Sequence, residues 1–253
     1  MDKKILSIII PAYNEERTIT KLLDKLIEAD LSPYDKEIIL INDASKDNTL
    51  AVVNEYLGKL TPDKSSFIKV LSNEQNLKKS QTVKKGILLS RGDLVVTQDA
   101  DLEYEPSNLK SFIQLFETDP TIDIIYGNRF VNNNKVIYWQ NYLGNKLLTL
   151  ISNLFTFRNG FVVKDMEVCY KMGKGNIIRK IATQIVSENN FGIEPEITAR
   201  LSRYIDKKTG KHLKLKVLSI DYYPRTIAEG KHMKAFRDGF SALKEIFRFN
   251  LQS

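Results

Sequence analysis

The sequence predicts an α/β fold, with a doubly wound, mostly parallel sheet followed by a C-terminal helical extension. Over about the first 130 residues, runs of Ile, Val and Leu alternate with segments that carry apolar residues at helical spacing. These runs are continuous, which is typical of parallel strands buried on both faces. Polar clusters follow three of the runs, at the strand ends where doubly wound sheets bind ligands. The three observations predict βαβ units with one ligand site at an edge of the sheet.

The expected strands and helices alternate along the chain. We expect strands at residues 5–10, 37–42, 67–72, 93–98 and 122–127. We expect helices between them at residues 15–29, 48–60, 80–92 and 106–118. Pro106 stands at the start of the last helix, where its missing N–H removes no hydrogen bond. Lysines in and just before the third helix are expected on an exposed face: Lys78, Lys79, Lys84 and Lys85.

Beyond residue 130 the alternation gives way to two amphipathic segments. The first runs from Tyr138 to Phe157 and the second from Ala235 to Phe249. In the second, Phe residues share one side of the helix and Lys and Arg occupy the other. We therefore expect one domain over residues 1–230 and a C-terminal amphipathic helix over residues 231–253, packed on that domain or on a membrane surface.

Composition excludes several classes of protein. With 42% hydrophobic and 27% charged residues, the chain is typical of a soluble globule. Cys169 is the one cysteine, which excludes an internal disulfide and a cysteine zinc cluster and favours a reducing compartment. We expect neither a signal peptide nor a membrane-spanning helix, because the apolar runs are too short. The net charge of +7 favours an anionic partner, such as nucleic acid, anionic lipid or a phosphorylated ligand.

Three polar clusters define the expected site. PAYNEE follows the first strand, NDASKDNT the second and QDADLEYE the fourth. Because the carboxyl ends of parallel strands meet at one edge of a sheet, these clusters are expected to form a single site. No glycine-rich phosphate loop of standard spacing follows a strand, which argues against a dinucleotide dehydrogenase and a P-loop NTPase. A diphosphate would then be bound by a metal ion and basic side chains.

Asp99 and Asp101 flank Ala100 and are candidates for a metal site. Mg²⁺ usually takes one or two carboxylates together with substrate phosphates, so this sparse pair suits a metal bound with a diphosphate. Alternatively, the two aspartates close a turn and cap the following helix. Asp43 is expected to contact a nucleotide base or ribose, or else to cap the next helix. The pattern alone assigns no role to Asn42.

Eight motifs extend over nearly the whole chain: IIIPAYNEE, NDASKDNT, QDADLEYEP, YGNRF, YLGNKLLT, DMEVCYK, FGIEPEITARL and YYPRTIAEGKHM. On these motifs the sequence resembles the family 2 glycosyltransferases with the GT-A fold. The resemblance is to the branch similar to dolichol-phosphate mannosyltransferase and the bacterial polyprenyl-phosphate glycosyltransferases. It implies an inverting, metal-dependent transfer of a hexose from a nucleotide-sugar donor, of the GDP-mannose or UDP-glucose type, to a dolichyl or undecaprenyl phosphate. Mg²⁺ or Mn²⁺ is the implied cofactor.

The resemblance also implies roles for individual residues. The implied donor site consists of Pro11, Tyr13, Asn14, Glu15, Asn42, Asp43, Asp99, Ala100, Arg225, Lys231 and His232. The implied metal ligands are Asp99 and Asp101, with Glu103 as an additional ligand. The implied catalytic residues are Asp101, Arg129 and Arg225. Asn42 is a departure, because many members of the family have aspartate there.

The chemistry is consistent without a dedicated base. A phosphate acceptor is already anionic near neutral pH, so the protein has to position it and neutralise the leaving diphosphate. Arg129 would hold the acceptor phosphate through two parallel hydrogen bonds. A second hypothesis keeps the fold and transfers the sugar to a glycan hydroxyl in cell-surface polysaccharide synthesis, with Asp165 or Glu167 as the base.

A polyprenyl-phosphate acceptor implies peripheral contact with a membrane, and we expect it at the cytoplasmic face. One of the two amphipathic segments would lie in the membrane interface. Alternatively, both segments pack on the sheet, or one of them forms a dimer contact. The sequence is compatible with a homo-oligomer. A non-catalytic module bound to nucleic acid would explain the positive charge but not the convergence of Asp43, Asp99 and Asp101. We therefore expect no nucleic-acid partner.

Overall fold

The computed structural model describes residues 3–130, 134, 138–226 and 235–251. The strands are β1 (Ile5–Ala12), β2 (Asp35–Asn42), β3 (Ile68–Ser72), β4 (Leu94–Thr97), β5 (Ile124–Asn128), β6 (Lys171–Lys174) and β7 (Leu215–Ser219). The helices are α1 (Ile19–Glu28), α2 (Thr49–Lys59), α3 (Pro62–Ser65), α4 (Lys78–Leu89), α5 (Asn108–Thr118), α6 (Trp139–Thr156), α7 (Gly175–Ala182), α8 (Ile193–Arg203) and α9 (Ala235–Leu251), with a 3₁₀ turn, η1 (Phe157–Asn159).

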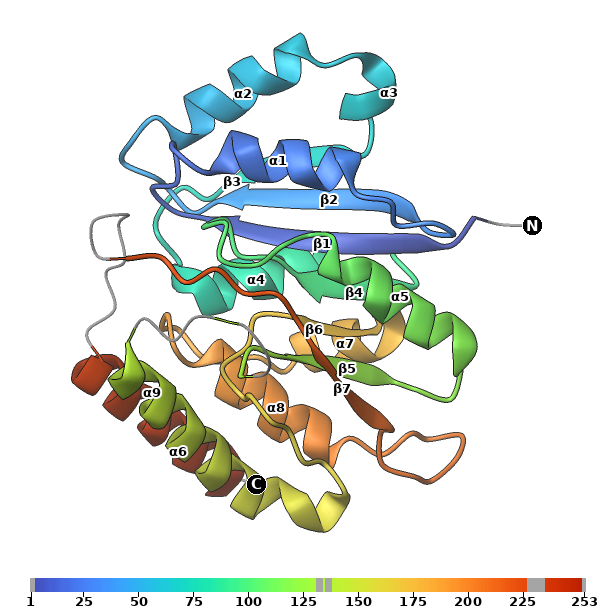
Figure 1. The fold of residues 1–253 in the computed structure, drawn as a ribbon, viewed down its shortest axis with the longest axis vertical. Helices are drawn as coiled ribbons and strands as arrows, with labels where there is room; N and C mark the ends of the chain where they lie inside the picture. Colours follow the sequence, from blue (N-terminus) through green and yellow to red (C-terminus); the bar gives the residue numbers. More distant parts are fainter. Residues whose placement is uncertain (1–2, 131–133, 135–137, 227–234, 252–253) are drawn as a thin grey trace.

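The strands of this described part form one sheet in the order β3-β2-β1-β4-β6-β5-β7 (Figure 1). β1 pairs in parallel with β2 and β4, β2 with β3, and β5 with β7. β6 is antiparallel to both of its neighbours, β4 and β5. The prediction of a doubly wound, mostly parallel sheet is confirmed.

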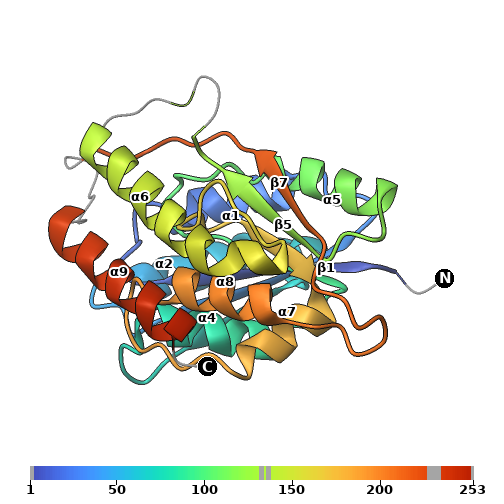
Figure 2. The same cartoon turned by 90° about the horizontal axis from the view of Figure 1, so that it is seen from below.

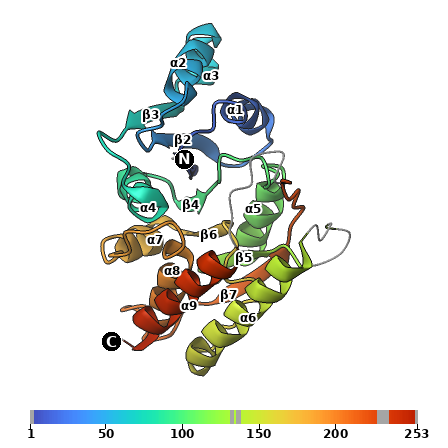
Figure 3. The ribbon, with the colours of Figure 1, turned by 90° about the vertical axis from the view of Figure 1, so that its left-hand side faces the viewer.

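The core is densest around β1 and β2. Ile8, Ile9 and Ile10 of β1 are fully buried, as are Ile38 and Ile39 of β2. Because successive side chains of a strand point to opposite faces, such an unbroken run requires cover on both sides of the sheet. Figure 3 shows α1 and α5 on one side and α4 and α7 on the other. This cover leaves the carboxyl ends of the strands as the place for a site.

Helices α6, α8 and α9 lie side by side at the β5–β7 end of the sheet (Figure 2). The expected C-terminal amphipathic helix is α9, and it packs on the other two. Its Ile246 and Phe249 are buried, and the ring of Phe247 lies 5.6 Å from that of Phe155 in α6. Phe240 is instead 72% exposed, so the phenylalanines divide between two faces. The predicted boundary at residues 230 and 231 lies outside the described residues and stays a prediction.

Strands β6 and β7 and helix α7 were not predicted. β6 has the sequence KMGK, which contains no apolar run. Its place in the sheet depends on packing, since a Cβ on Gly173 would lie 2.7 Å from Cδ1 of Ile124 in β5. Within the described residues, no helix has the length and apolar character that crossing a bilayer requires.

Replacing Gly86 by alanine is expected to destabilise the fold. A Cβ on Gly86 of α4 would lie 2.3 Å from Cγ2 of Ile9, so overpacking against β1 should cost about 1–3 kcal/mol. Gly58 of α2 is the matched control, because nothing lies within 4 Å of its Cβ position. There alanine should stabilise by about 0.5 kcal/mol through its helix propensity. Urea unfolding curves of the two variants should shift in opposite directions, and a shift in the same direction would contradict the packing described.

Candidate active site

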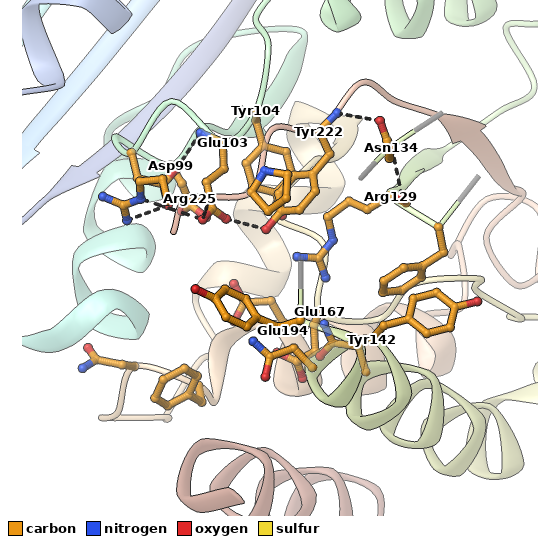
Figure 4. Close-up of a pocket in the computed structure, with 18 of the residues that line it drawn as sticks. Asp99, Glu103, Tyr104, Arg129, Asn134, Tyr142, Glu167, Glu194, Tyr222 and Arg225 are labelled. Atoms are coloured by element: carbon orange, nitrogen blue, oxygen red, sulfur yellow. Dashed lines mark hydrogen bonds and ion pairs between the residues drawn. The ribbon is translucent and has the colours of Figure 1, made fainter. Parts of the chain in front are cut away.

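Two cavities meet at the carboxyl ends of β1, β2 and β4. The large cavity, of about 440 Å³, extends toward α6 and α8 (Figure 4). The small cavity, of about 260 Å³, lies over the ends of β1 and β2. Both are lined by Glu15, Lys79, Asp99, Asp101 and Asn190. The three polar clusters that are far apart in the sequence are thus brought together here.

The backbone is strained at four points around these cavities. Asn14, Ala44, Lys78 and Leu102 have positive φ angles of 58°, 55°, 67° and 63°. They follow β1, β2, β3 and β4 respectively, each beyond the carboxyl end of its strand. A residue with a Cβ in this conformation costs about 1–2 kcal/mol. Strain that the surrounding fold maintains in this way clusters at functional sites.

The small cavity contains most of the donor residues that the sequence predicted. Pro11, Tyr13, Asp43 and Ala100 line it together with the shared residues. The orientation of Asp43 is fixed, because its Oδ1 accepts hydrogen bonds from Nδ2 of Asn73 and the N–H of Leu77, both at 2.8 Å. The carboxylate is therefore held at the cavity wall rather than used as a helix cap.

Asn14 and Asn42 serve the turns beside the small cavity. Oδ1 of Asn14 accepts from the N–H of Lys46 at 2.8 Å, and Oδ1 of Asn42 accepts from the N–H of Ser45 at 3.2 Å. Neither is among the residues that line the two cavities. Their predicted contacts with the donor stay predictions. Lys231 and His232, predicted near the diphosphate, lie outside the described residues.

Three carboxylates surround the guanidinium of Arg225 where the cavities join. Nη2 lies 3.0 Å from Oδ2 of Asp101, Nη1 lies 3.6 Å from Oε2 of Glu15, and Nε lies 3.8 Å from Oε1 of Glu103. Burial raises the pKa of Asp101 to about 7, and the charges of Asp99 and Glu103 add to this effect while Arg225 opposes it. Burial also raises the pKa of Glu15. The cluster carries more negative charge than this one guanidinium neutralises.

Glu103 holds the segment that carries Arg225. Its carboxylate accepts hydrogen bonds from the Tyr222 hydroxyl and, at 2.9 Å, from the N–H of Arg225. Its carbonyl accepts from the N–H of Tyr223 at 2.8 Å. Figure 4 shows Glu103 between Tyr222 and Arg225. The carboxylate thus joins the turn after β4, which contains Glu103, to the segment after β7. Its predicted role as a metal ligand stays a prediction.

Lys79 is the cation next to Asp99. Its Nζ lies 2.9 Å from Oδ1 of Asp99 and 2.9 Å from Oε1 of Glu194 in α8. Burial raises the pKa of Asp99, but the charge and hydrogen bond of the adjacent Lys79 ammonium outweigh this effect, so the pKa lies below its usual value. The prediction of an exposed lysine face was wrong here, and also for Lys84 and Lys85, which donate to Ile185 O and Asn73 Oδ1, each at 2.7 Å. Lys78 is exposed as predicted.

Arg129 lies in the wall of the large cavity and is paired with Asp165. Nε and Nη2 donate to the two carboxylate oxygens at 2.7 and 2.8 Å. The side chains are 10% and 0% exposed, so the pair is buried. The two parallel bonds that the sequence assigned to an acceptor phosphate are therefore made to Asp165, and Nη1 is the nitrogen outside this pair. Asp165 is correspondingly a partner of Arg129 rather than a base.

Glu167 lines the large cavity and has one buried carboxyl oxygen without a hydrogen bond to the described residues. Its Oε1 is out of contact with solvent and has no hydrogen-bond partner in the part of the chain that the structure describes. Burial raises the pKa of Glu167 to about 8, and the nearby Glu194 carboxylate adds to this effect, while Lys171 and Arg129 oppose it. Figure 4 shows Glu167 beside Glu194, across the cavity from Glu103 and Arg225. This group can accept or donate a proton near neutral pH.

A sequence model of the family described as Glycosyl transferase family 2 matches residues 7–184, most of the chain. The chain belongs to glycosyltransferase family 2. The predicted resemblance is confirmed.

Several curated relatives of this family 2 glycosyltransferase are sugar transferases by name. Over 108 residues it is 41% identical to "Dolichyl-phosphate beta-glucosyltransferase" of Dictyostelium discoideum, which covers 40% of this chain and 32% of the relative. Over 137 residues it is 30% identical to "Dolichol-phosphate mannosyltransferase" of Pyrococcus furiosus, which covers 54% of this chain and 36% of the relative. The chain thus matches about a third of the length of each of these relatives.

Solved glycosyltransferase structures share the fold. A structure of glucosyl-3-phosphoglycerate synthase from Mycobacterium tuberculosis, in complex with Mn²⁺, UDP and phosphoglyceric acid, superimposes with a TM-score of 0.66 at 17% identity. The match covers 97% of this chain and 78% of that structure. At this identity the likeness is one of fold, and it confirms the GT-A architecture predicted from the sequence.

The acidic cluster of this family 2 glycosyltransferase fits a divalent cation in one particular way. Within the described ranges, no group of three His, Cys, Asp or Glu residues is arranged to hold a metal by itself. Asp99 and Asp101 are two hard oxygen ligands in a crowded negative site, and the pKa of Asp101 is raised first by burial and then by the charges of Asp99 and Glu103. The donor set therefore fits Mg²⁺ or Mn²⁺ with the remaining ligands supplied by a diphosphate.

Sequence reasoning missed Lys79 and Tyr222 as parts of the site. Lys79 was missed because lysines close together in a helix are typical of an exposed surface. The positive φ of Lys78, which precedes it, gives no signal in the sequence. Tyr222 stands beside Tyr223 in the motif YYPRTIAEGKHM, and that motif was the available signal. Its contact with Glu103 exists only because the segment after β7 runs back along the β4 turn.

Replacing Glu167 by glutamine should change how stability depends on pH. An acid whose pKa rises from 4.5 when unfolded to about 8 when folded binds its proton more tightly in the folded state. The wild type therefore loses stability as the pH rises from about 5 to about 8, and the glutamine variant lacks this loss.

Urea unfolding at pH 5 and pH 9 measures this difference. Relative to wild type, Glu167→Gln should gain stability between the two pH values, by about 1–4 kcal/mol. The exposed Glu188→Gln is the control and should show no such trend. A constant offset between Glu167→Gln and wild type at the two pH values would contradict the environment described for Glu167.

Proposed function

We propose that this chain transfers a hexose, with inversion, from a nucleotide-sugar donor to a polyprenyl phosphate. One observation carries the proposal: two cavities of different lining meet at Asp99 and Asp101, where carboxylates and basic side chains are interleaved. A donor has a nucleoside and a sugar on either side of a diphosphate, and this is the order in which the small cavity, the charged junction and the large cavity follow one another. The names of the curated relatives support the same class of reaction.

On the donor side, Pro11, Tyr13 and Asp43 would bind the nucleoside, and Arg225 would meet the diphosphate. Mg²⁺ or Mn²⁺ held by Asp99 and Asp101 would neutralise charge on the leaving diphosphate. Arg225 sits within the same cluster and adds a fixed positive charge where negative charge develops. Asp101 acts by holding that charge arrangement in place. Lys231 and His232 remain in the proposal as further diphosphate contacts.

On the acceptor side, the large cavity combines a cation with neutral polar groups. Arg129 reaches it from β5, and the polar side chains Asn134, Asn141 and Asn145 also line it. The buried Asp165 fixes the guanidinium, so the nitrogen outside the pair, Nη1, is pre-oriented toward an acceptor phosphate. Because a phosphate monoester is already anionic near neutral pH, no side chain has to deprotonate it.

Glu167 supports a second candidate, transfer to a glycan hydroxyl. A hydroxyl nucleophile needs a base, and a base works best when its pKa lies near the working pH. The pKa of about 8 and the unpartnered Oε1 give Glu167 these properties. This candidate is the weaker one, because the two curated relatives described above are named for prenyl-phosphate acceptors.

A membrane contact through α6 belongs to the proposal. Trp139, Leu143, Leu147, Leu150, Leu154 and Phe157 recur at helical spacing and are all more than half exposed. On the adjacent α9, Phe240 and Leu251 are also exposed. Helix α6 also contributes Asn141, Tyr142 and Asn145 to the large cavity. An acceptor held there would therefore have its prenyl chain close to the exposed apolar residues of α6.

Transfer assays with labelled UDP-glucose and GDP-mannose test the function. With Mg²⁺ or Mn²⁺ and a short polyprenyl phosphate, we expect sugar on the lipid phosphate and none on the matching prenyl alcohol. Asp101→Asn should lower the rate by about 10²–10³-fold, because it removes charge from the junction. Asp63→Asn, an exposed aspartate of α3, is the control and should be unchanged.

The two candidates separate by a matched pair of variants. Arg129→Gln combined with Asp165→Asn removes both buried charges together and should abolish transfer to phosphate while nucleotide binding persists. Glu167→Gln should abolish transfer only if the acceptor is a hydroxyl. Failure to bind either UDP or GDP with both metals present would overturn both candidates.

Charges placed on the α6 stripe should weaken membrane binding. Leu147→Glu with Leu154→Glu should reduce cosedimentation with anionic vesicles at least about tenfold, since two leucines lose their apolar contact. Leu88→Glu with Leu89→Glu is the matched control, because these α4 leucines are similarly exposed but lie away from the stripe. An equal loss in both double variants would argue that α6 is not the membrane-binding face.

A further inference from the structure

The amino group of Lys79 occupies the place that a metal at Asp99 would need. Nζ lies 2.9 Å from Oδ1 and 3.1 Å from Oδ2 of Asp99, so it bridges both oxygens of the carboxylate. Asp101 is engaged through one oxygen, Oδ2, by Nη2 of Arg225 at 3.0 Å. Asp99 is thus paired with the Lys79 ammonium, and Asp101 with a guanidinium that it shares with Glu15 and Glu103. A divalent ion that approaches Asp99 must therefore displace Lys79, because two cations repel strongly at such a separation.

Lys79 has a second anchor that keeps it in the site after it leaves Asp99. Oε1 of Glu194 lies 2.9 Å from Nζ, and the Glu194 side chain is 8% exposed. The backbone is fixed as well, because the N–H of Lys79 donates to Oδ1 of Asn190 at 3.2 Å and Lys78 has a φ of 67°. The ammonium can therefore move by a small side-chain rotation without release from the fold.

The position of Lys79 suits a diphosphate. It lines both the small and the large cavity, at the junction that a nucleotide-sugar would cross. It also stands in the first turn of α4, where the positive end of the helix dipole favours an anion. The side chain is 25% exposed, in contrast to the buried Arg129–Asp165 pair, so a ligand can reach it.

We propose that Lys79 is a resident counter-ion of Asp99 that changes partner when the donor binds, passing from the carboxylate to the diphosphate as the metal takes its place. This inference rests on the proposed function. It makes Lys79 a positioning residue that couples two ligands. Metal alone competes with the lysine and binds weakly, whereas metal with diphosphate gives the displaced ammonium a new anion. Such coupling between ligands is typically about 5–150-fold.

Mn²⁺ binding measured by electron paramagnetic resonance, with and without UDP or GDP, tests this on the whole chain. Lys79→Gln keeps hydrogen-bond donors for both carboxylates but removes the charge. It should bind Mn²⁺ alone at least about threefold more tightly than wild type, and the tightening of Mn²⁺ by nucleotide should fall at least about fivefold. With Mn²⁺ saturating, its affinity for UDP and GDP should fall, and that for UMP and GMP should change less. Lys79→Arg should retain the coupling.

The matched control is Lys84→Gln, on the same helix, whose Nζ donates to the carbonyl of Ile185 outside both cavities. It loses the same charge and should match wild type in every measurement. Lys79→Met serves as a second variant in case the glutamine amide mimics the lysine, and melting curves identify any variant that fails to fold. Opposite changes in metal and diphosphate affinity are the signature, because a merely structural lysine would weaken both.

The outcomes distinguish this inference from the proposed function. If wild type binds Mn²⁺ with UDP or GDP, but Lys79→Gln and Lys79→Met bind Mn²⁺ alone no more tightly than wild type, the partner exchange is overturned and the proposed function stands. The exchange is overturned in the same way if wild type and both Lys79 variants bind Mn²⁺ alone with equal affinity, or if none of the three binds Mn²⁺ alone detectably. If wild type binds neither nucleotide with Mn²⁺, both the proposed function and the exchange fail.

Discussion

The carboxylates of Asp99 and Asp101 lie two residues apart at the end of β4, largely withdrawn from water, and neither can stay ionised there without a cation close by. Lys79 provides it for Asp99, whose pKa is lowered, whereas Arg225 only partly offsets the burial of Asp101, whose pKa is still raised to about 7. The two cations are far apart in the sequence, one at the start of α4 and the other in the segment after β7. The charge requirement of one short turn therefore joins the N-terminal and C-terminal parts of the fold, and the site is complete only when both have arrived.

The strained backbone around the site depends on the rigidity of the parallel sheet. Four residues with positive φ lie beyond the carboxyl ends of the first four strands, and three of them, Asn14, Ala44 and Leu102, are in the polar clusters that the sequence singled out. The parallel sheet is rigid because its Ile-rich strands are covered on both faces, and this rigidity holds the turns in conformations they would not adopt alone. A site that must present several charges within a few ångströms gains from such fixed geometry, because little reorganisation is needed when a charged ligand binds.

The larger cavity is built by the part of the chain that departs from the βαβ pattern. β6 enters the sheet antiparallel between β4 and β5, and the segment just before it carries Asp165, which pairs with Arg129, and Glu167, which lines the cavity. α8 brings Glu194 to Lys79, and α6 closes the cavity with polar side chains on one face while its other face is an exposed leucine stripe. One helix therefore serves both the acceptor side of the site and the apolar surface beside it. This arrangement links the place of chemistry to the place where a lipid would be found.

The sequence by itself determined the parallel half of the fold, because unbroken Ile and Val runs at the spacing of βαβ units have few other ways to bury both faces. It also determined that Asp43, Asp99 and Asp101 would share an edge, since the carboxyl ends of parallel strands must meet. Tertiary structure decided the rest. The sequence pattern predicted Lys79 on the surface, but in the structure it lies between Asp99 and Glu194. The pattern also predicted that Arg129 binds phosphate through two parallel hydrogen bonds, but in the structure Asp165 accepts both of these bonds. Such pairings join residues 20 to 115 positions apart, and a local pattern cannot show which charges will be buried together, because that depends on how the later helices pack.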